Sequence, residues 1–488
     1  MVPPPLRLHA GLLTAFAVIA FGLCLGAGFV FDDFAIFTAA PLTRPFTWLT
    51  FRLNEAIGGQ NPALFHAVNL ALHLLAIWLA RDALGRAIPA RAADIGAILF
   101  ALHPIQAEAV NYIWSRSTLL MTVFCLLSIR DWFRGRHWWA VAWFGVALLA
   151  KEECVALPLF FALLHLSISR NQSEWKPIGA MLVLSLVSGG YVLWAANVTP
   201  GSQAGAQSQY STSEYLSSQG AAILHYFRLT LAPVGFTVDP VISSGQWIAW
   251  VPLIALACGA MFRFSKAREG FWFLAGLVLL LPSSSIFPAN DLAADRRMYL
   301  PLFAFSAVVG ILLQRIDRRV ILVLALIFTG LSVRRSWVWQ SDTRIWREAM
   351  QMSPGKVRPR IQLARTLPAA EAIPLLLEAQ KIDPNNPLTA SELGRVYLAM
   401  NEVGDSLAQF GKALALAPNS PQALSNRGVA LLMLRQTDAA RADFVRALSI
   451  EPCGFEALYN LKRLGANIAT PAHCRYTQWQ RESLAGVH

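Results

Sequence analysis

Long apolar stretches recur along this chain as far as about residue 333, and then they stop. Such stretches must be buried in a lipid bilayer or in a large core, and a helical crossing needs about 20 predominantly apolar residues. Of the 488 residues, 55% are hydrophobic and only 14% are charged, whereas soluble proteins carry about 25% charged residues. The pattern therefore predicts an all-α protein with a polytopic membrane domain followed by a soluble domain.

The apolar runs predict about eleven membrane crossings, several of them shorter than a bilayer normally requires. The first run is followed by Asp32 and Asp33 and not by a small-residue cleavage site, so we interpret it as a retained crossing. The segment at about 219–236 contains Arg228 and Pro233, and we interpret it as a surface or re-entrant helix. The predicted crossings are approximately 9–30, 63–80, 93–112, 117–129, 138–150, 153–168, 178–196, 248–262, 271–287, 299–313 and 320–334.

The distribution of charge predicts the orientation. The net charge is +12, but the Lys and Arg residues lie largely in short loops, and no basic stripe with interleaved aromatic residues indicates nucleic-acid binding. Cation-rich loops alternate with more acidic ones, and the cation-rich side of a membrane protein is cytoplasmic. We therefore expect a cytoplasmic N-terminus in a membrane that is a bacterial inner membrane, with everything after about residue 335 in the periplasm.

The C-terminal third repeats with a period of 34 residues. Asp383-Pro384, Ala417-Pro418 and Glu451-Pro452 recur at this spacing, and Gly394 and Gly428 keep the same period. A 34-residue period with small residues at helix contacts and proline between units is typical of tetratricopeptide repeats. We predict a membrane domain over 1–335 and a repeat domain over 336–488, with clear repeats at 386–419 and 420–453, a degenerate repeat upstream and a capping helix at 455–464.

Two of the six cysteines, Cys453 and Cys474, fall in the exported part. Disulfides form in oxidising compartments such as the periplasm. A disulfide between these two residues is therefore a hypothesis, which a free thiol at both positions would contradict.

The adjacent residues Asp32 and Asp33 follow the first crossing. Two carboxylates at a membrane boundary are costly unless water, a metal or a cation meets them. They could be catalytic, or they could cap the next short helix, and the sequence does not distinguish the two residues. A divalent cation at Asp32 or Asp33 also stays open, although no ligand spacing demands a metal.

Further polar residues are predicted on the same outer side. His103 and Glu108 lie about 140° apart if their segment is helical, and Arg116 follows them. These residues could line a wide cavity, or they could be a buried histidine and a capped glutamate.

Two later clusters carry cations. Lys151-Glu152-Glu153 places a lysine on the outer side, where a carboxylate or a phosphate could hold it. Asp295-Arg296-Arg297, followed by Tyr299, offers planar guanidinium donors that suit phosphate oxygens. The alternatives are a surface ion pair and an ordinary interfacial tyrosine. Carboxylates and cations on one side suit a reaction in which a carboxylate activates an acceptor and cations hold a lipid-phosphate leaving group.

The ordered series of motifs resembles the TMTC-type (transmembrane and tetratricopeptide repeat) protein O-mannosyltransferases of the GT-C glycosyltransferase superfamily. The motifs are Phe31-Asp32-Asp33, Arg44-Pro45, Phe65-His66-Ala67-Val68-Asn69 with His73, Ala101-Leu102-His103-Pro104 with Glu108-Ala109-Val110 and Arg116, Lys151-Glu152, and Asp295-Arg296 with Tyr299-Leu300-Pro301, followed by the repeats.

The resemblance implies an inverting transfer of a sugar from a polyprenyl-phosphate donor to a protein Ser or Thr. Asp32 or Asp33 would be the catalytic base. Arg296 and Lys151 would bind the donor phosphate, and the repeats would recruit the acceptor protein or peptide. From their own chemistry, the neighbouring Arg297 and Tyr299 are further candidates to bind that phosphate. His103, Glu108, Arg116, Glu152 and Asp295 would line the cavity.

The chain departs from the family pattern at Asp295, where the family usually has Glu, and Arg297 is an additional cation. The repeat array is also short. A non-enzymatic membrane-anchored repeat scaffold is therefore the alternative function. A transporter is less consistent with charges gathered at one edge of the bilayer.

Overall fold

A computed structural model describes residues 10–38, 42–169, 174–198, 208–243, 245, 247–264, 268–284, 287–471, 474 and 476–486. Every regular element in these residues is a helix, so the predicted all-α class is confirmed. Contacts divide the chain into two compact units. The first comprises Met1–Asp33 and Ala40–Ser341, and the second comprises Phe34–Ala39 and Asp342–His488.

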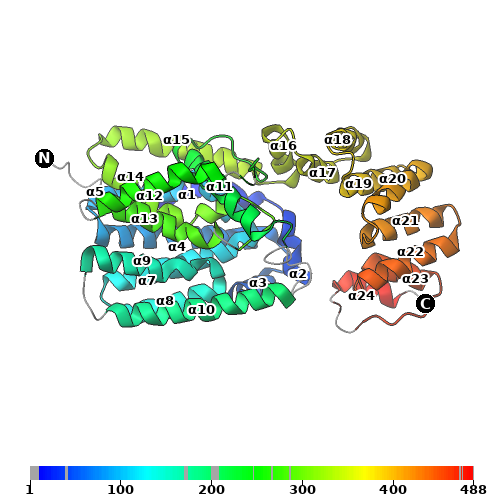
Figure 1. Ribbon diagram of the computed structural model, residues 1–488, viewed down its shortest axis with the longest axis horizontal. Coiled ribbons are helices and arrows are strands. Elements are labelled where there is room, and N and C mark those ends of the chain that lie inside the picture. The colour runs from blue at the N-terminus through cyan, green and yellow to red at the C-terminus, as the bar shows by residue number, and fades with distance from the viewer. Residues whose placement is uncertain are drawn as a thin grey trace. The chain divides into compact units, whose positions relative to one another are not determined.

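The first unit is a bundle of apolar helices (Figure 1). Within the bundle, α7 packs on α4 and α8, α14 packs on α5 and α13, and α1 packs on α15. Its longer helices are α1 (Ala10–Phe21), α3 (Pro45–Gly58), α4 (Pro62–Ala87), α5 (Ala90–Leu102), α7 (Arg116–Phe133), α8 (His137–Ala150), α9 (Leu157–Leu164), α10 (Trp175–Val198), α11 (Thr212–Leu231), α12 (Trp250–Phe264), α13 (Arg268–Leu280), α14 (Pro301–Leu313) and α15 (Arg318–Val338).

Four helices among the described residues are long and apolar enough to cross a membrane: Pro62–Ala87, Ile113–Phe133, Trp175–Val198 and Arg318–Val338. A bent pair, Gly11–Gly26 with Phe31–Phe37, is a fifth candidate, and three shorter apolar helices accompany them. The chain is thus a membrane protein, while the predicted number of about eleven crossings stays a prediction. The helix α11 is not among these candidates.

Two predicted crossings are broken helices. The run 9–30 ends its α-helix at Phe21 and continues as a short 3-10 helix, η1 (Gly22–Gly26). The run 93–112 breaks after Leu102, where Pro104 opens another 3-10 turn, η3 (Pro104–Gln106), and the five-residue α6 (Ala107–Asn111) follows. Proline lacks the N–H that a continuing helix needs and fits the first helical position instead. The apolar pattern alone did not show these breaks.

The two ends of the first unit are defined by helices that run in parallel. Near their C-terminal ends, the Ser336 hydroxyl of α15 donates to the Ala20 carbonyl of α1 at 2.9 Å. Near their N-terminal ends, Leu12 of α1 and Arg318 of α15 line the same groove, so the two helices run the same way. Because only four residues separate α14 from α15, and α14 leads back along α5, the residues after α1, those before α14 and those after α15 lie at the same end. We call this end the Asp32 end, and we call the opposite end, where α15 begins, the Arg318 end.

Small residues hold α5 and α14 close together. A Cβ added at Gly310 of α14 would collide with the Ala92 carbonyl of α5, and one at Gly96 of α5 would lie 3.0 Å from the Ser306 carbonyl of α14. Only glycine permits this approach of the two backbones. The close contact fixes α14, whose preceding turn carries Arg296 and Arg297.

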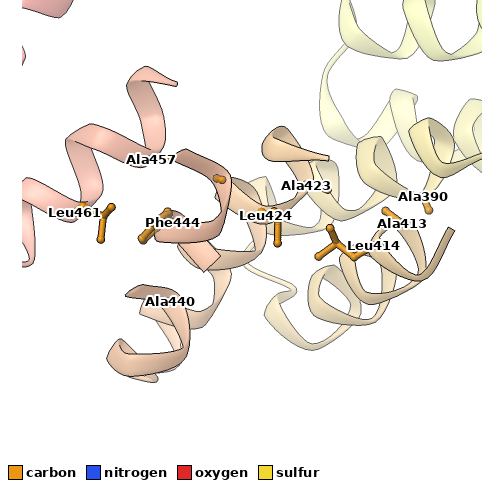
Figure 2. Close-up of a cluster of buried hydrophobic side chains, with 10 residues drawn as sticks. Ala390, Ala413, Leu414, Ala423, Leu424, Ala440, Phe444, Ala457 and Leu461 are labelled. Atoms are coloured by element: carbon orange, nitrogen blue, oxygen red, sulfur yellow. The ribbon is translucent and has the colours of Figure 1, made fainter. Parts of the chain in front are cut away.

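The second unit is a stack of helix pairs (Figure 1). Its helices alternate in the order expected of tetratricopeptide repeats, and Figure 2 shows the buried Ala, Leu and Phe side chains between neighbouring pairs. The helices are α16 (Asp342–Met352), α17 (Val357–Arg365), α18 (Ala369–Ile382), α19 (Pro387–Ala399), α20 (Val403–Leu416), α21 (Pro421–Met433), α22 (Thr437–Ile450), α23 (Phe455–Arg463) and α24 (Gln478–Ala485), with the short α2 (Ala35–Thr38) in the same unit.

The 34-residue period has a direct structural cause. A Cβ at Gly394 would lie 2.7 Å from the Phe410 ring, and a Cβ at Gly428 would lie 2.6 Å from the Phe444 ring. The glycine of the first helix therefore makes room for the phenylalanine of the second helix in each repeat. This phenylalanine, which also recurs after 34 residues, was a signal that the sequence analysis did not use.

A disulfide joins Cys453 to Cys474, which confirms the hypothesis from the sequence. It closes a loop with a sequence separation of 21. Behind it, Tyr476 and Leu484 pack against Phe455 and Leu458 of the capping helix α23. The disulfide therefore tethers the C-terminal segment to the last helix pair.

We predict that Gly428→Ala destabilises the second unit by about 1–3 kcal/mol, because the new methyl group overlaps the buried Phe444 ring. The matched control is Gly411→Ala in α20, where a Cβ meets nothing within 4 Å. This control should stabilise its helix by up to about 1 kcal/mol. Chemical denaturation of the full chain, monitored in the repeat unit, measures both changes. Equal effects of the two variants would contradict the explanation of the repeat period.

Candidate active site

The acidic pair after the first crossing is divided by burial. Asp33 is completely buried, and its two carboxylate oxygens accept the backbone N–H groups of Val30 at 3.0 Å and Trp114 at 2.8 Å. Trp114 lies in the short helix η4 (Ile113–Ser115) before α7. The Asp33 carboxylate thus joins the end of the first crossing to the start of α7, which is a structural task.

Asp32 is exposed, and its carboxylate accepts a hydrogen bond from the Tyr112 hydroxyl at 3.3 Å. The preceding residue, Phe31, has a φ of 49°, in the left-handed region that a phenylalanine rarely adopts. Its ring packs edge-on against Tyr112 and Trp339. Strained backbone persists where the surroundings hold it and is common at functional sites. Asp32 is therefore the member of the pair that a ligand can reach.

Glu108 connects Arg296 to the short helix α6, at whose end Tyr112 lies. The Glu108 carboxylate, 6% exposed, accepts from the backbone N–H of Arg296 at 3.1 Å and forms an ion pair with its guanidinium. Glu108 and Tyr112 lie one turn apart at α6, where the Tyr112 N–H donates to the Glu108 carbonyl at 3.2 Å. One turn of helix thus brings Asp32 and Arg296 to one place at the Asp32 end.

The charge of Arg296 is strongly stabilised. Burial lowers the pKa of its guanidinium, but the charges of Glu108 and Asp291 more than offset burial and raise the pKa above its ordinary value. Its side chain remains 27% exposed, and its Nη2 lies 3.5 Å from an Asp291 carboxylate oxygen. Arg296 is therefore a permanent cation that a ligand can approach.

Arg297 is held differently. Its guanidinium donates to the carbonyls of Leu292 at 3.1 Å and Asp291 at 2.7 Å, and it is 9% exposed. Carbonyl oxygens satisfy its donors without neutralising its charge, so Arg297 adds positive potential beside Arg296. Both arginines line a cavity of about 10 Å³ with Glu153, room for about one water molecule.

Lys151 and Glu152 lie in two neighbouring ion pairs. The Lys151 ammonium, 4% exposed, bonds to the Thr118 hydroxyl at 2.9 Å and to Glu153 at 2.8 Å. Glu152 accepts two hydrogen bonds from the guanidinium of Arg44, at the start of α3. Burial raises the pKa of the Glu152 carboxyl, but Arg44 more than offsets burial and lowers the pKa to about 2.

Arg116 and His103 act as anchors inside the helical unit. The fully buried Arg116 guanidinium donates to Asn69 and Asn54 side-chain oxygens, both at 2.9 Å, and to the Phe65 carbonyl at 2.9 Å, which joins α7 to α3 and α4. His103 accepts from the Ile105 N–H at 3.2 Å and donates from Nε2 to the Thr230 carbonyl at 3.1 Å. Both ring nitrogens of His103 are thus engaged by backbone.

Tyr299 and Asp295 are also buried and do not line an open cavity. Tyr299 is completely buried, and its hydroxyl lies 2.7 Å from Nδ1 of His73. It is therefore not an interfacial tyrosine, and its hydroxyl is directed at another side chain. Asp295 is 6% exposed and begins the short helix η11 (Asp295–Met298) that carries both arginines.

Tyr112, Arg44 and Glu153 are among the residues at this site that were missing from the predicted set. Arg44 is part of the motif Arg44-Pro45, and Glu153 stands next to predicted residues, so both gave a signal. Tyr112 gave none, because a tyrosine at the end of an apolar run is ordinary.

The donor set does not fit a protein-held metal. Among the described residues, no group of three His, Cys, Asp or Glu side chains is arranged to hold an ion. Both oxygens of Asp33 already accept backbone N–H groups, so Asp32 is the one carboxylate of this adjacent pair that is exposed. Divalent cations such as Mg²⁺ and Ca²⁺ prefer several oxygen ligands, so we derive no step through a metal.

The fold and site define a helical membrane protein with an ionic site at one end and a tetratricopeptide-repeat unit. No family model matches the chain. Among curated proteins, it is 26% identical to the human protein O-mannosyl-transferase TMTC4 over 410 residues, which are 66% of this chain and 55% of TMTC4. It is 22% identical to mouse TMTC3 over 445 residues, 76% of this chain and 48% of TMTC3.

A third relative, the protein O-mannosyl-transferase F38B6.6 of Caenorhabditis elegans, is 23% identical over 73% of this chain and 59% of its own length. The resemblance to the TMTC-type proteins is thereby confirmed, and the chain spans about half the length of these relatives. Among solved structures, ArnT from Cupriavidus metallidurans bound to undecaprenyl phosphate is 17% identical, with a TM-score of 0.42 over 94% of this chain and 80% of ArnT.

We predict that the Arg44–Glu152 pair makes the first unit sensitive to acid. The folded pKa of Glu152, about 2, lies below the ordinary 4.5, so the ionised pair stabilises the fold above about pH 4.5. The contribution, at most roughly 3 kcal/mol, is lost as the pH falls towards 2. The unfolding free energies of wild type and Glu152→Gln should therefore differ most at pH 6, differ by less than half as much at pH 3, and converge near pH 2.

The matched control is Glu55→Gln, which removes an exposed partner of Arg52 and should change the unfolding free energy by about 0–1 kcal/mol. A difference between wild type and Glu152→Gln that is as large at pH 3 as at pH 6 would contradict the assignment.

Proposed function

We propose that this protein is an integral-membrane glycosyltransferase that moves a hexose, such as mannose, from a polyprenyl-phosphate donor to the hydroxyl of a protein Ser or Thr. The observation that carries the proposal is that Asp32 and Arg296 both contact the short helix α6 and its C-cap. Asp32 accepts a hydrogen bond from Tyr112, and Arg296 pairs with Glu108. An exposed carboxylate and an approachable permanent cation are the two groups that such a transfer needs.

In this reaction, Asp32 accepts the proton of the acceptor hydroxyl. The hydroxyl oxygen attacks the anomeric carbon, a new glycosidic C–O bond forms, and the bond from that carbon to the lipid phosphate oxygen breaks. Attack from the side opposite the leaving group inverts the anomeric configuration. The departing phosphate gains negative charge, which the Arg296 guanidinium stabilises with added potential from Arg297.

The other residues hold this arrangement in place. Asp33 ties the loop that carries Asp32 to the start of α7, and the Tyr112 hydroxyl orients the Asp32 carboxylate. Lys151 remains a donor-binding candidate because a phosphate could take the place of Glu153 at its ammonium. The protein O-mannosyl-transferase relatives support the sugar-transfer class.

The surroundings of the reaction follow from the predicted topology. We infer that the Asp32 end faces the periplasm of a bacterial inner membrane, where nucleotide-activated donors are scarce and a lipid-linked donor is the natural substitute. The repeats would then recruit the acceptor protein or peptide, since stacked helix pairs offer a concave surface.

A membrane-anchored scaffold is the second candidate function. The observation that favours it is the internal pairing of charges, because Arg44, Lys151 and Arg296 each have a carboxylate partner. The small cavity beside the two arginines also has no room for a sugar phosphate in this state. Transfer therefore requires the lipid phosphate to open this site, whereas a scaffold requires no opening.

We predict that Asp32→Asn lowers sugar transfer by about 10²–10⁴-fold, the usual contribution of general base catalysis. Folding should be unaffected, because Asp32 is exposed. Asp33→Asn should instead lower stability, since it removes a buried charge that accepts two backbone N–H groups. Intact-mass profiling of exported proteins, with and without each variant, measures the hexose-sized increment, and thermal unfolding measures stability.

Tyr112→Phe is the matched control, because it removes the hydroxyl that orients Asp32 and keeps the Asp32 carboxylate. It should lower transfer less than Asp32→Asn does. Full transfer by Asp32→Asn would overturn the enzyme proposal as stated. The scaffold would be favoured if wild type adds no hexose-sized increment to exported proteins and binds a partner protein. Deletion of residues 386–464 should then abolish binding of this partner, and Asp32→Asn should retain it.

A further inference from the structure

A second lipid-facing feature lies at the Arg318 end, away from the candidate active site. A groove of about 260 Å³ runs between α1, α5 and α15, and its lining is apolar apart from Arg318 and Arg319. Phe16, Ile98 and Leu322 represent the three helices in this lining. Since all three helices belong to the first unit, the groove is a property of the membrane bundle alone.

The two arginines occupy the first turn of α15. A helix N-terminus carries partial positive charge, so two cations there are unfavourable unless an anion accompanies them. Asp317 caps the helix by accepting the Arg319 backbone N–H at 2.7 Å. Among the described residues, no carboxylate or carbonyl binds either guanidinium. The groove therefore ends in a net positive charge, because the one Asp317 carboxylate can offset only one of the two arginines.

Tertiary contacts hold this cationic end in position. The buried Arg91 of α5 donates to the carbonyls of Gln314, at 2.6 Å, and Ile316, in the loop that precedes α15. The tight contact of Gly310 with Ala92 fixes the other side of that loop. The arginines thus stand at the mouth of a preformed groove and not on a mobile loop.

The dimensions of the groove indicate what it takes. Its volume of about 260 Å³ is smaller than the roughly 300–1,000 Å³ that encloses a whole small molecule. An apolar channel of this size suits part of one acyl chain, and the arginine pair suits the phosphate at the end of that chain. A zwitterionic lipid would bring its own cation next to the two arginines, which disfavours it.

We propose that this groove binds one acyl chain of an anionic glycerophospholipid, with the headgroup phosphate between Arg318 and Arg319. The lipid belongs to the leaflet at which α1 and α15 begin, which is the cytoplasmic leaflet in the predicted topology. The site is thus separate from the donor site at the Asp32 end, and it does not depend on the proposed transfer reaction. Its occupancy would hold α1 against α15, the contact on which the position of Asp32 depends.

The test uses the purified full chain in phosphatidylcholine nanodiscs, to which dioleoylphosphatidylglycerol is added. We expect selective retention of phosphatidylglycerol by native mass spectrometry and a higher unfolding temperature. R318Q/R319Q should weaken its binding about 30-fold, since each arginine near an anionic surface contributes about fivefold. Leu322→Trp, which fills the groove and keeps both arginines, should weaken binding as well.

The matched control is R136Q/R315Q, which removes the same charge from two exposed arginines outside the groove and should leave phosphatidylglycerol binding unchanged. Equal retention of phosphatidylcholine and phosphatidylglycerol by wild type would overturn the proposal, even if R318Q/R319Q failed to fold. Weakening by the control as strong as by R318Q/R319Q would indicate general charge attraction and would also overturn it. Full binding by Leu322→Trp, or stronger competition by a polyprenyl phosphate than by phosphatidylglycerol, would exclude an acyl chain of a phospholipid in the groove.

Discussion

The pairing of charges at one edge of an apolar bundle is the constraint on which the rest of this structure depends. Ionised groups beside a bilayer are costly unless partners meet them. The chain meets this cost with the pairs Arg296–Glu108 and Arg44–Glu152, each drawn from distant parts of the sequence, and with the local pair Lys151–Glu153. The two long-range pairs each join separate elements, so the same contacts that neutralise the charges also bring the loops of the Asp32 end together.

The break between α5 and α6 places these charges. A continuous helix over 93–112 would have directed His103 and Glu108 to different sides. In the structure, Pro104 starts a new turn, His103 is engaged by backbone on both ring nitrogens, and Glu108 meets Arg296. The short helix α6 then carries both the partner of Arg296 and, one turn later, the partner of Asp32. A local departure from regular helix is thus the element that assembles the candidate site.

Burial divides residues that the sequence presents as equivalent. Asp32 and Asp33 are neighbours with the same side chain, yet one is exposed and the other accepts two backbone N–H groups inside the protein. Arg296 and Arg297 divide in the same way between carboxylate and carbonyl partners. Residue type and spacing carry no information about such partners, which come from other elements. Tyr299 makes the same point, because its hydroxyl meets His73 across 226 positions.

The sequence by itself determined the helical class, the apolar bundle and the repeats. The reason is that hydrophobic runs specify individual helices, and the 34-residue period specifies packing within and between neighbouring helix pairs. Gly394 and Gly428 could be identified because each makes room for one aromatic ring in its own repeat. The candidate residues of the site were also mostly present in the motifs, including Asp32, Glu108 and Arg296. Only the tertiary structure decided which of them is exposed, which is an anchor such as Arg116, and that Tyr112 links the acid to the arginine. The physical reason is that burial and hydrogen-bond partners depend on contacts between segments far apart in the chain, which no local pattern records.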